Sequence, residues 1–264
     1  MKRREFITAS LVTGTAALTS WNEAIGGSGG DKREFYELRK YYMLIGNKKK
    51  RLNDFLKDVA IPAWNRIGIG PVGVFNVQFG PNKPTLYVLL PHKNIESVIT
   101  ARDKLAEDKE YQKAGADFLN TSIDDPGYFR IESSLMRAFK NIPELEVPEL
   151  TRKKKPRLFE LRTYESHSEL YARKKIQMFN EGGELAIFRK TGLTPVFFGE
   201  RLIGERLPSL TYMVVFENMA EREKAWDRFR NHPDWLKLKE DPQYKNTVSN
   251  ITVYFLTPTA YSQI

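Results

Sequence analysis

The stretch Glu34-Phe35-Tyr36-Glu37-Leu38-Arg39-Lys40-Tyr41 is repeated later in the chain as Arg157-Leu158-Phe159-Glu160-Leu161-Arg162-Thr163-Tyr164. The offset between the two copies is 160 − 37 = 123. A second match, Gly68-Ile69-Gly70-Pro71-Val72 against Gly192-Leu193-Thr194-Pro195-Val196, has an offset of 195 − 71 = 124. Ordered matches at a nearly constant offset indicate two structural units with the same plan.

The residues after the first copy predict the order strand, helix, strand, strand, helix, strand. Residues 33–44 alternate as a strand, Leu52, Phe55, Leu56 and Val59 share one helical face, and Pro62 is expected to bend or end that helix. Strands over 72–79 and 85–90 are joined across Gly80-Pro81-Asn82, which is a hairpin signal. A second helix carries Val98, Ala101 and Leu105, and a strand over 129–139 closes the unit.

The second unit repeats this plan. We expect strands over 157–166, 195–203, 210–217 and 248–257, one helix over 168–190 and another from Met219. Gly182-Gly183 lies inside the first of these helices, where it would allow close packing or a kink. Trp64, Trp226 and Trp235 occupy helix positions and are expected in the core.

A β-α-β-β-α-β unit forms a four-stranded antiparallel sheet with both helices on one face, so the other face of the sheet is bare. Two such sheets in one chain can cover each other's bare faces. We therefore predict an α+β fold of two tandem ferredoxin-like units, whose antiparallel sheets pack into a pseudo-twofold α+β barrel ringed by helices.

The first thirty residues are predicted to lie outside this fold. Lys2-Arg3-Arg4-Glu5-Phe6-Ile7 leads into a weakly apolar run from Thr8 to Thr19, as in a twin-arginine export signal. That run is too short and polar for a membrane span, and an uncleaved tail or amphipathic anchor is the alternative. The expected organisation is a signal and linker over 1–30, a first domain over 31–142, a Pro-rich and basic linker over 143–156, and a second domain over 157–264.

The composition limits the chemistry that the chain can perform. It contains no cysteine, which excludes disulfides, a thiol nucleophile and Cys-ligated zinc or iron–sulfur centres. This suits export of a folded chain to the periplasm or cell envelope. The net charge of +9 favours an anionic ligand or surface. The basic run Arg152-Lys153-Lys154-Lys155 has no interleaved aromatic residues, so we interpret it as a solvated linker and expect no nucleic-acid partner.

Three motifs together point to a family. They are Phe/Tyr-Glu-Leu-Arg-x-Tyr on the first strand of each unit, a Gly-x-x-Pro-Val turn, and Trp226 followed by His232-Pro233-x-Trp235. Over nearly all of residues 33–258 the chain resembles the NIPSNAP family. The resemblance implies a place among the dimeric α+β barrels, whose other branches include antibiotic-biosynthesis monooxygenases and haem-degrading enzymes. The first unit departs from the motif, because Asp108-Lys109-Glu110-Tyr111 stands where the second unit has His232-Pro233-Asp234-Trp235.

Side chains alternate between the two faces of a strand, which divides the repeated motif into an apolar and a polar set. The polar set is Glu37, Arg39 and Tyr41 in the first unit and Glu160, Arg162 and Tyr164 in the second. If the apolar set packs under the helices, the polar sets point into the barrel and make a polar lumen. There the arginines would grip an anionic group beside the tyrosines, with a glutamate as base. The alternative, which we favour, is that these ions pair with each other and with backbone groups and have only a structural role.

No catalytic or metal-binding motif is evident elsewhere. The three histidines, His92, His167 and His232, form no His-x-His, His-x-x-x-His or His-Glu-x-x-His pattern, so no metal site is predicted. We interpret His232 as a helix cap, and it is also the best single candidate for a haem ligand, although no cofactor is predicted. The turn tips at Asn82-Lys83 and Glu205-Arg206 are interpreted as solvated.

These features favour an exported NIPSNAP-like protein, a binding protein more than an enzyme. It would take a small anionic or aromatic molecule, or a protein partner, through the barrel lumen or rim. The alternative is a monooxygenase or a haem-binding or haem-degrading enzyme that uses the same lumen. A deep cavity lined by Arg39, Arg162 and both tyrosines would indicate a ligand, and a lumen filled by side chains a scaffold. Exposed strand edges would favour a homo-oligomer.

Overall fold

Eight strands close into one antiparallel barrel in the part of the chain that the structure describes. A computed structural model describes residues 32–43, 48–79 and 84–264, and Arg33–Ile264 form one compact unit. The expected export signal over 1–30, the hairpin turn at Gly80-Pro81-Asn82 and the tip Asn82-Lys83 lie outside the described residues. None of the helices within the described ranges is long and apolar enough to cross a membrane.

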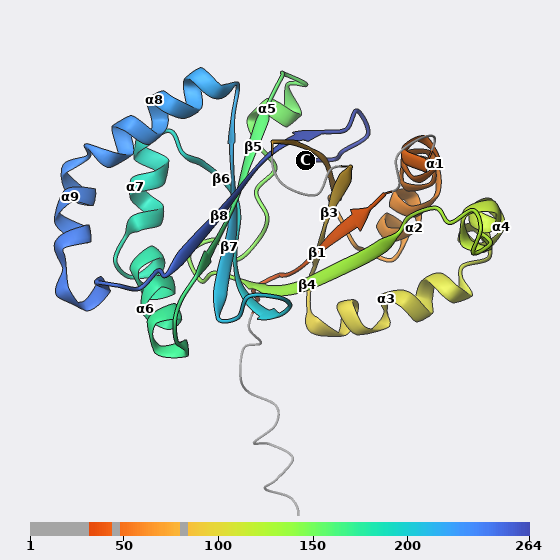
Figure 1. Ribbon diagram of the computed structural model, residues 1–264, viewed down its shortest axis with the longest axis horizontal. Coiled ribbons are helices and arrows are strands. Elements are labelled where there is room, and N and C mark those ends of the chain that lie inside the picture. The colour runs from red at the N-terminus through yellow and green to blue at the C-terminus, as the bar shows by residue number, and fades with distance from the viewer. Residues whose placement is uncertain (1–31, 44–47, 80–83) are drawn as a thin grey trace, which may run out of the picture. The chain divides into compact units, whose positions relative to one another are not determined.

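The first half of this unit is a four-stranded sheet covered by helices (Figure 1). The strands are β1 (Phe35–Tyr42), β2 (Gly73–Phe79), β3 (Thr85–His92) and β4 (Arg130–Ala138), in the order β4-β1-β3-β2. The helices are α1 (Lys48–Phe55), a π-helical turn η1 (Leu56–Ala60), α2 (Ile61–Arg66), α3 (Ile95–Glu107) and α4 (Lys109–Leu119). Leu52, Trp64 and Leu105 from the helices share one buried cluster with Val74 and Val88 from the sheet.

The second half has the same arrangement. Its strands are β5 (Leu158–Glu165), β6 (Thr194–Ile203), β7 (Ser209–Phe216) and β8 (Asn250–Pro258), in the order β8-β5-β7-β6. Its helices are α6 (Glu169–Asn180), α7 (Glu184–Thr191), α8 (Met219–Arg230) and α9 (Pro233–Glu240), followed by the 3-10 turn η2 (Pro242–Tyr244). Phe179, Phe188, Trp226 and Phe229 form their shared core with the sheet.

The two sheets join edge to edge at two seams. β2 pairs with β8, with Asn76 opposite Thr257, and β4 pairs with β6, with Arg137 opposite Glu200. The full order β1-β3-β2-β8-β5-β7-β6-β4 is therefore closed, and no described strand has an unpaired edge. The predicted α+β barrel is confirmed. The strand edges on which we based the expected homo-oligomer are instead used within the chain.

The predicted helix over 168–190 is two helices, α6 and α7, separated at Gly182-Gly183. Gly183 has a φ of 85°, a left-handed conformation that glycine adopts without steric penalty. A Cβ atom on Gly182 would lie 2.6 Å from the carbonyl oxygen of Met178. The glycine pair therefore ends one helix and begins the next, and the prediction of a continuous helix was wrong.

The helix around Pro62 continues to Arg66, after a π-helical turn at Leu56–Ala60. A proline inside a helix lacks an amide donor and crowds the carbonyl group four residues earlier, which here belongs to Asp58 in that turn. A π-helical turn is one of the ways in which a helix absorbs such a disturbance. We expected Pro62 to bend or end the helix. The helix instead continues to Arg66, and the turn before Pro62 has π-helical hydrogen bonding.

The predicted linker over 143–156 is packed against both halves of the barrel. Its backbone is anchored where Glu34 N donates to Pro143 O at 2.8 Å and Glu146 N donates to Val196 O at 2.9 Å. The short helix α5 (Glu149–Arg152) lies within it. Lys153 and Lys155 pair with exposed acids, Glu149 at 3.3 Å and Glu217 at 3.6 Å. This agrees with the interpretation of the basic run as a solvated segment.

Candidate functional site

One end of the barrel interior is filled by apolar side chains from both halves. The ring centroids of Tyr36 and Phe197 are 5.1 Å apart, and those of Phe75 and Phe159 are 4.9 Å apart. Ile264 is fully buried in the same cluster. The two bare sheet faces therefore stabilise each other by ordinary core packing, and this end of the interior is not an open lumen.

The motif residues predicted to point into the barrel lie on the opposite face of the sheets, under the helices. These residues are Glu37, Arg39, Tyr41, Glu160, Arg162 and Tyr164. Tyr41 packs with Leu52 and Trp64 in the first helical layer, and Glu160 accepts a hydrogen bond from Trp226 on α8. Their predicted placement in the lumen is wrong, because strand alternation separates two sets of side chains without deciding which set faces inward.

In the second half, the polar set is a closed ion network centred on Glu160. Its carboxylate is fully buried and accepts from Arg162 Nη1 at 2.6 Å, Arg222 Nε at 2.9 Å and Trp226 Nε1 at 2.9 Å. Burial raises the pKa of Glu160, but the hydrogen bond from Arg222 and the charge of Arg162 outweigh burial and hold it below the ordinary value. Every oxygen of the carboxylate is used, which fits a structural role.

In the first half, Glu37 forms a smaller network. Arg39 donates from Nε at 2.7 Å and from Nη2 at 2.8 Å, and Ser133 donates at 2.7 Å. The Nε2 atom of buried His92 lies 3.9 Å from the carboxylate, beyond hydrogen-bond distance. Burial raises the pKa of Glu37, but the neighbouring His92 and Arg39 outweigh burial and lower it to about 2. The guanidinium group of Arg39 also lies 5.5 Å from the Trp64 ring centre.

The other end of the barrel interior is polar, and we call it the barrel mouth. Its cavity is ≈ 70 Å³ and is lined by Leu38, Lys40, Tyr42, Tyr87, Leu161, Thr163, Arg201, Glu205, Arg206, Thr252 and Tyr254. Glu205 and Arg206 come from the turn between β6 and β7, and the other residues lie on strands, where they continue the inward-facing rows of the apolar core. A polar interior was predicted, but the side chains that make it polar differ from those that the motif suggested.

Arg201 is the most unusual charged group of the barrel mouth. Only 8% of its surface is exposed. It donates from Nη1 to the Glu205 carbonyl oxygen at 2.7 Å and from Nη2 to Thr211 Oγ1 at 2.9 Å. Within the described residues its Nε has no hydrogen-bond partner and its guanidinium group pairs with no carboxylate. Burial lowers the pKa of Arg201. Because no carboxylate of the described residues pairs directly with this buried cation, a bound anion would stabilise it.

The other cations of the barrel mouth have acidic partners. Lys40 contacts Glu205 and lies 3.4 Å from Glu132, and Arg206 lies 3.1 Å from Glu165. Both side chains of the tip Glu205-Arg206 are exposed, which agrees with its interpretation as solvated, and both also form ion pairs at the opening. The inward position of Arg201 could have been predicted from the sequence. Arg201 lies four residues after the inward-facing Phe197 on β6, and alternate residues of a strand share one face.

His232 lies at the start of α9, outside the sheet. Its Nδ1 accepts a hydrogen bond from Asp234 N at 3.2 Å, so the capping interpretation is confirmed. Since α9 belongs to the helical layer of the second half, His232 does not face the barrel interior. Within residues 32–43, 48–79 and 84–264, no group of three or more His, Cys, Asp or Glu is arranged to hold a metal ion.

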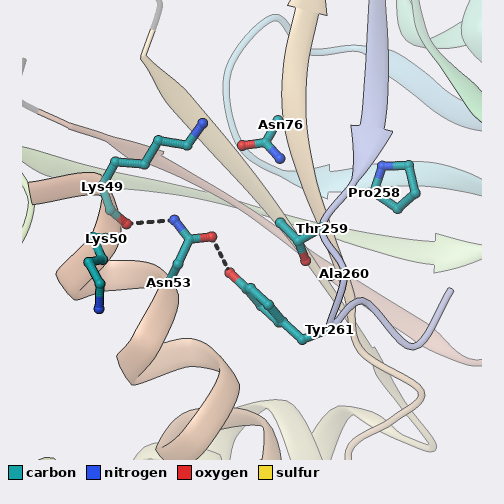
Figure 2. Close-up of a pocket in the computed structure, with 8 residues that line it drawn as sticks. All are labelled: Lys49, Lys50, Asn53, Asn76, Pro258, Thr259, Ala260 and Tyr261. Atoms are coloured by element: carbon teal, nitrogen blue, oxygen red, sulfur yellow. Dashed lines mark hydrogen bonds between the residues drawn. The ribbon is translucent and has the colours of Figure 1, made fainter.

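A second, shallow pocket lies between α1 and the segment that follows β8 (Figure 2). Figure 2 shows Tyr261 directed at Asn53, to which it donates a hydrogen bond at 2.6 Å. The lysines at its edge are surface groups, and Lys50 pairs with Asp54 at 2.6 Å. Exposed lysines are weakly constrained, so the barrel mouth is the stronger candidate site.

A family model described as NIPSNAP matches residues 36–125 and 159–263, one segment in each half. None of the curated proteins compared with this chain is a match.

Among solved structures, a proposed monooxygenase from Lactobacillus acidophilus NCFM has a TM-score of 0.56 and 9% identity, over 86% of this chain and 94% of its own. A NIPSNAP-like domain protein from Burkholderia xenovorans has a TM-score of 0.36 and 20% identity, over 40% of this chain and 88% of its own. A heme-binding protein from Thermus thermophilus has a TM-score of 0.47 and 10% identity, over 87% of this chain and 92% of its own. The first likeness shows the fold alone, and we draw nothing from the two lower scores.

Proposed function

The chain belongs to the NIPSNAP family, and from that premise we propose that it binds a small anionic molecule at the barrel mouth. We propose further that each half is a ferredoxin-like unit, because the order β4-β1-β3-β2 recurs as β8-β5-β7-β6. On this proposal the six polar residues of the repeated motif do not bind the ligand. They have the structural role that we gave as one of the two alternatives for them, in which the ions are paired within the protein. Export through residues 1–30 is also a proposal and rests on the sequence pattern.

The single observation that carries this proposal is the buried guanidinium group of Arg201. Its Nε has no partner in the described part of the chain. Hydroxyl groups of Thr163 and Thr211 lie beside it, 3.5 and 2.9 Å from Nη2. A hydrogen bond to a charged group contributes about 1.5–3 kcal/mol. An anion that reaches this guanidinium would gain that interaction and balance the buried charge.

The test is a calorimetric titration of the protein with three probes: benzoate, propionate and inorganic phosphate. We expect at least one to bind, and Arg201→Met to weaken that binding about tenfold or more, the factor that a lost charged hydrogen bond predicts. Arg137→Met is the matched control, because Arg137 lies on the adjacent β4 and pairs with Glu200 outside the barrel mouth. Absence of binding by all three probes would overturn the proposal.

Because Arg201 is buried, its substitution can also unfold the protein. Lys40→Met is a second variant that tests the same site. Lys40 lines the same opening, and its side chain is 16% exposed, compared with 8% for Arg201 as a whole residue. Thermal melting of each variant separates loss of binding from loss of folding. Folded variants of both residues that bind the anion as tightly as the original protein would also contradict the proposal.

The fold likeness to the Lactobacillus protein makes a monooxygenase the second candidate, and a haem-handling enzyme is the other form of this alternative that the sequence resemblance implies. The residues present do not fit a haem in the barrel interior. The cavity of ≈ 70 Å³ is far below the ~300–1,000 Å³ of typical ligand pockets, and His232 lies outside the sheet. Titration with haem, monitored at the Soret band, tests this candidate: a saturable shift would favour it over the anion-binding proposal.

A further inference from the structure

The hairpin between β6 and β7 brings a carboxylate of the chain itself to the barrel mouth. Glu205 stands at its tip, between Gly204 with a φ of 142° and Arg206 with a φ of 62°. The Glu205 carboxylate contacts the ammonium group of Lys40. Its carbonyl oxygen accepts from Arg201 at 2.7 Å. This tight turn therefore holds one anionic group against the cations of the opening.

The charges around Glu205 favour the ionised carboxylate. The hydrogen bond from Lys40 lowers the pKa of Glu205 against the opposing effect of burial, and the charges of Arg206 and Arg201 lower it further. Of the charged side chains that line the cavity, Lys40, Arg201 and Arg206 are cations and Glu205 is a carboxylate. Since Lys40 and Arg206 also have acidic partners in Glu132 and Glu165, Arg201 is the one cation of this lining without a carboxylate paired to it among the described residues.

The contact of Glu205 is one that an external carboxylate can replace. Its side chain is 46% exposed, and ion pairs of exposed groups contribute only about 0–1 kcal/mol. The carboxylate of Glu205 makes no hydrogen bond to Arg201, whose bond goes to the backbone carbonyl group. Lys40 and Arg201 both line the cavity, so a free carboxylate bound there would lie beside both cations, whereas the Glu205 carboxylate contacts Lys40 alone of the two.

The apolar residues that line the cavity indicate the chemical nature of the rest of the ligand. Leu38 and Leu161, each 3% exposed, lie beneath the charged groups, and the Tyr87 ring forms part of the wall. Apolar surface of this kind stabilises an apolar body, whereas a second charge placed there would lose its hydration without a partner.

From these contacts we infer that Glu205 occupies the barrel mouth in place of the ligand's own carboxylate, and that the ligand is a compact monocarboxylate with an apolar body. This inference rests on the proposed function and names its ligand class. Glu205 acts as an internal competitor: the ligand enters as the Glu205 side chain leaves Lys40, and the hairpin closes again on release.

The test compares the original protein with Glu205→Gln by calorimetric titration with benzoate, propionate and phosphate. Removal of the competing charge should tighten carboxylate binding about fivefold, which corresponds to a contact of about 1 kcal/mol. Glu200→Gln is the control, because Glu200 lies on β6, the strand that leads into this turn, but pairs with Arg137 outside the opening. We expect it to leave binding unchanged. Benzoate and propionate should bind more tightly than phosphate to both proteins.

The outcomes separate this inference from the proposed function. If both proteins bind a carboxylate with equal affinity, the competitor role of Glu205 is overturned and anion binding stands. If phosphate binds more tightly than either carboxylate, the ligand class is overturned and anion binding stands. If neither protein binds any of the three probes, the proposed function fails and this inference fails with it.

Discussion

The two halves of the barrel hold the same glutamate of the same motif in different ways. Glu160 has no exposed surface and is enclosed by Arg162, Arg222 and Trp226, whereas the Glu37 side chain is 15% exposed. Asn94 and Asn218 cap equivalent helices, with an offset of 218 − 94 = 124. By the same offset, the residue of the first half that is equivalent to Arg222 is Val98, since 222 − 98 = 124. The first half therefore has no arginine at this position.

This difference shows what a repeated motif specifies and what it does not. Each copy provides a Glu-x-Arg pair on one strand face, but the groups that complete the network come from α8 in one half and from β4 in the other. The barrel mouth is unequal in the same way, because Val77 is the equivalent of Arg201 by the offset 201 − 77 = 124. The two halves therefore have the same fold, but only the second half provides the buried arginine of the candidate site.

The largest effect that would test this comparison is expected from Glu160→Gln. It leaves two arginines beside a neutral group in a buried network, and breaking a buried pair costs about 3–5 kcal/mol. Glu37→Gln removes a partly exposed charge and should cost about 1–2 kcal/mol. Urea unfolding of both variants gives the two free energies.

Glu223→Gln is the control for this pair of variants, because Glu223 lies on α8 with a side chain that is 58% exposed. Its free energy of unfolding should change by no more than about 0.5 kcal/mol. Equal losses for the Glu160 and Glu37 variants would contradict the distinction between a closed and a partly open network.

An intermediate effect is expected at a buried ion pair that occurs in the second half alone. Lys175 Nζ lies 2.6 Å from Glu184 Oε2, and both side chains are at most 6% exposed. The offset 184 − 124 = 60 places Ala60 at the equivalent position. Burial raises the pKa of Glu184 in spite of Lys175, so in Lys175→Met the carboxyl group should take up a proton, at a cost of about 1–3 kcal/mol.

The double variant Lys175→Met with Glu184→Leu removes both charges of this pair. Replacement of a buried ion pair by apolar groups is often neutral or stabilising. Chemical denaturation should therefore show the double variant to be about as stable as the original protein. A double variant less stable than Lys175→Met alone would show that the pair itself is required.

The smallest effect is a dependence on pH in the first half. The pKa of Glu37 in the folded protein is about 2, below its ordinary value of 4.5. Its contribution to stability is therefore complete above pH 4.5 and is lost as the pH falls from 4.5 to about 2. The difference in unfolding free energy between the original protein and Glu37→Gln should shrink over this range. A difference that stays constant with pH would contradict the low pKa.

Much of the fold could be predicted from local patterns. The repeated strand motif and the helix periodicity identify eight strands and their order, and the bare sheet faces predict a closed barrel. The burial of Trp64 and Trp226 and the helix cap at His232 were predicted for similar reasons and are confirmed, whereas Trp235, also expected in the core, is only partly buried. The break at Gly182-Gly183 was missed because glycine is compatible with either a kink or a helix end.

The candidate site could not be predicted in the same way. Arg201 and Glu205 lie in a strand and a turn whose residue types are ordinary, and their meeting with Lys40 depends on how β1 and the β6–β7 hairpin are brought together. The strongest polar signal in the sequence, the Glu-x-Arg motif, instead proved to be buried under helices.

The sequence by itself determined the duplication, the strand and helix order and the separation of each strand into an apolar and a polar row, because these depend on residues near each other in the chain. The tertiary structure alone decided which row faces inward and where an unpaired charge remains. Those properties depend on which sheet face meets another sheet and which meets helices, and that choice is made by contacts between distant segments.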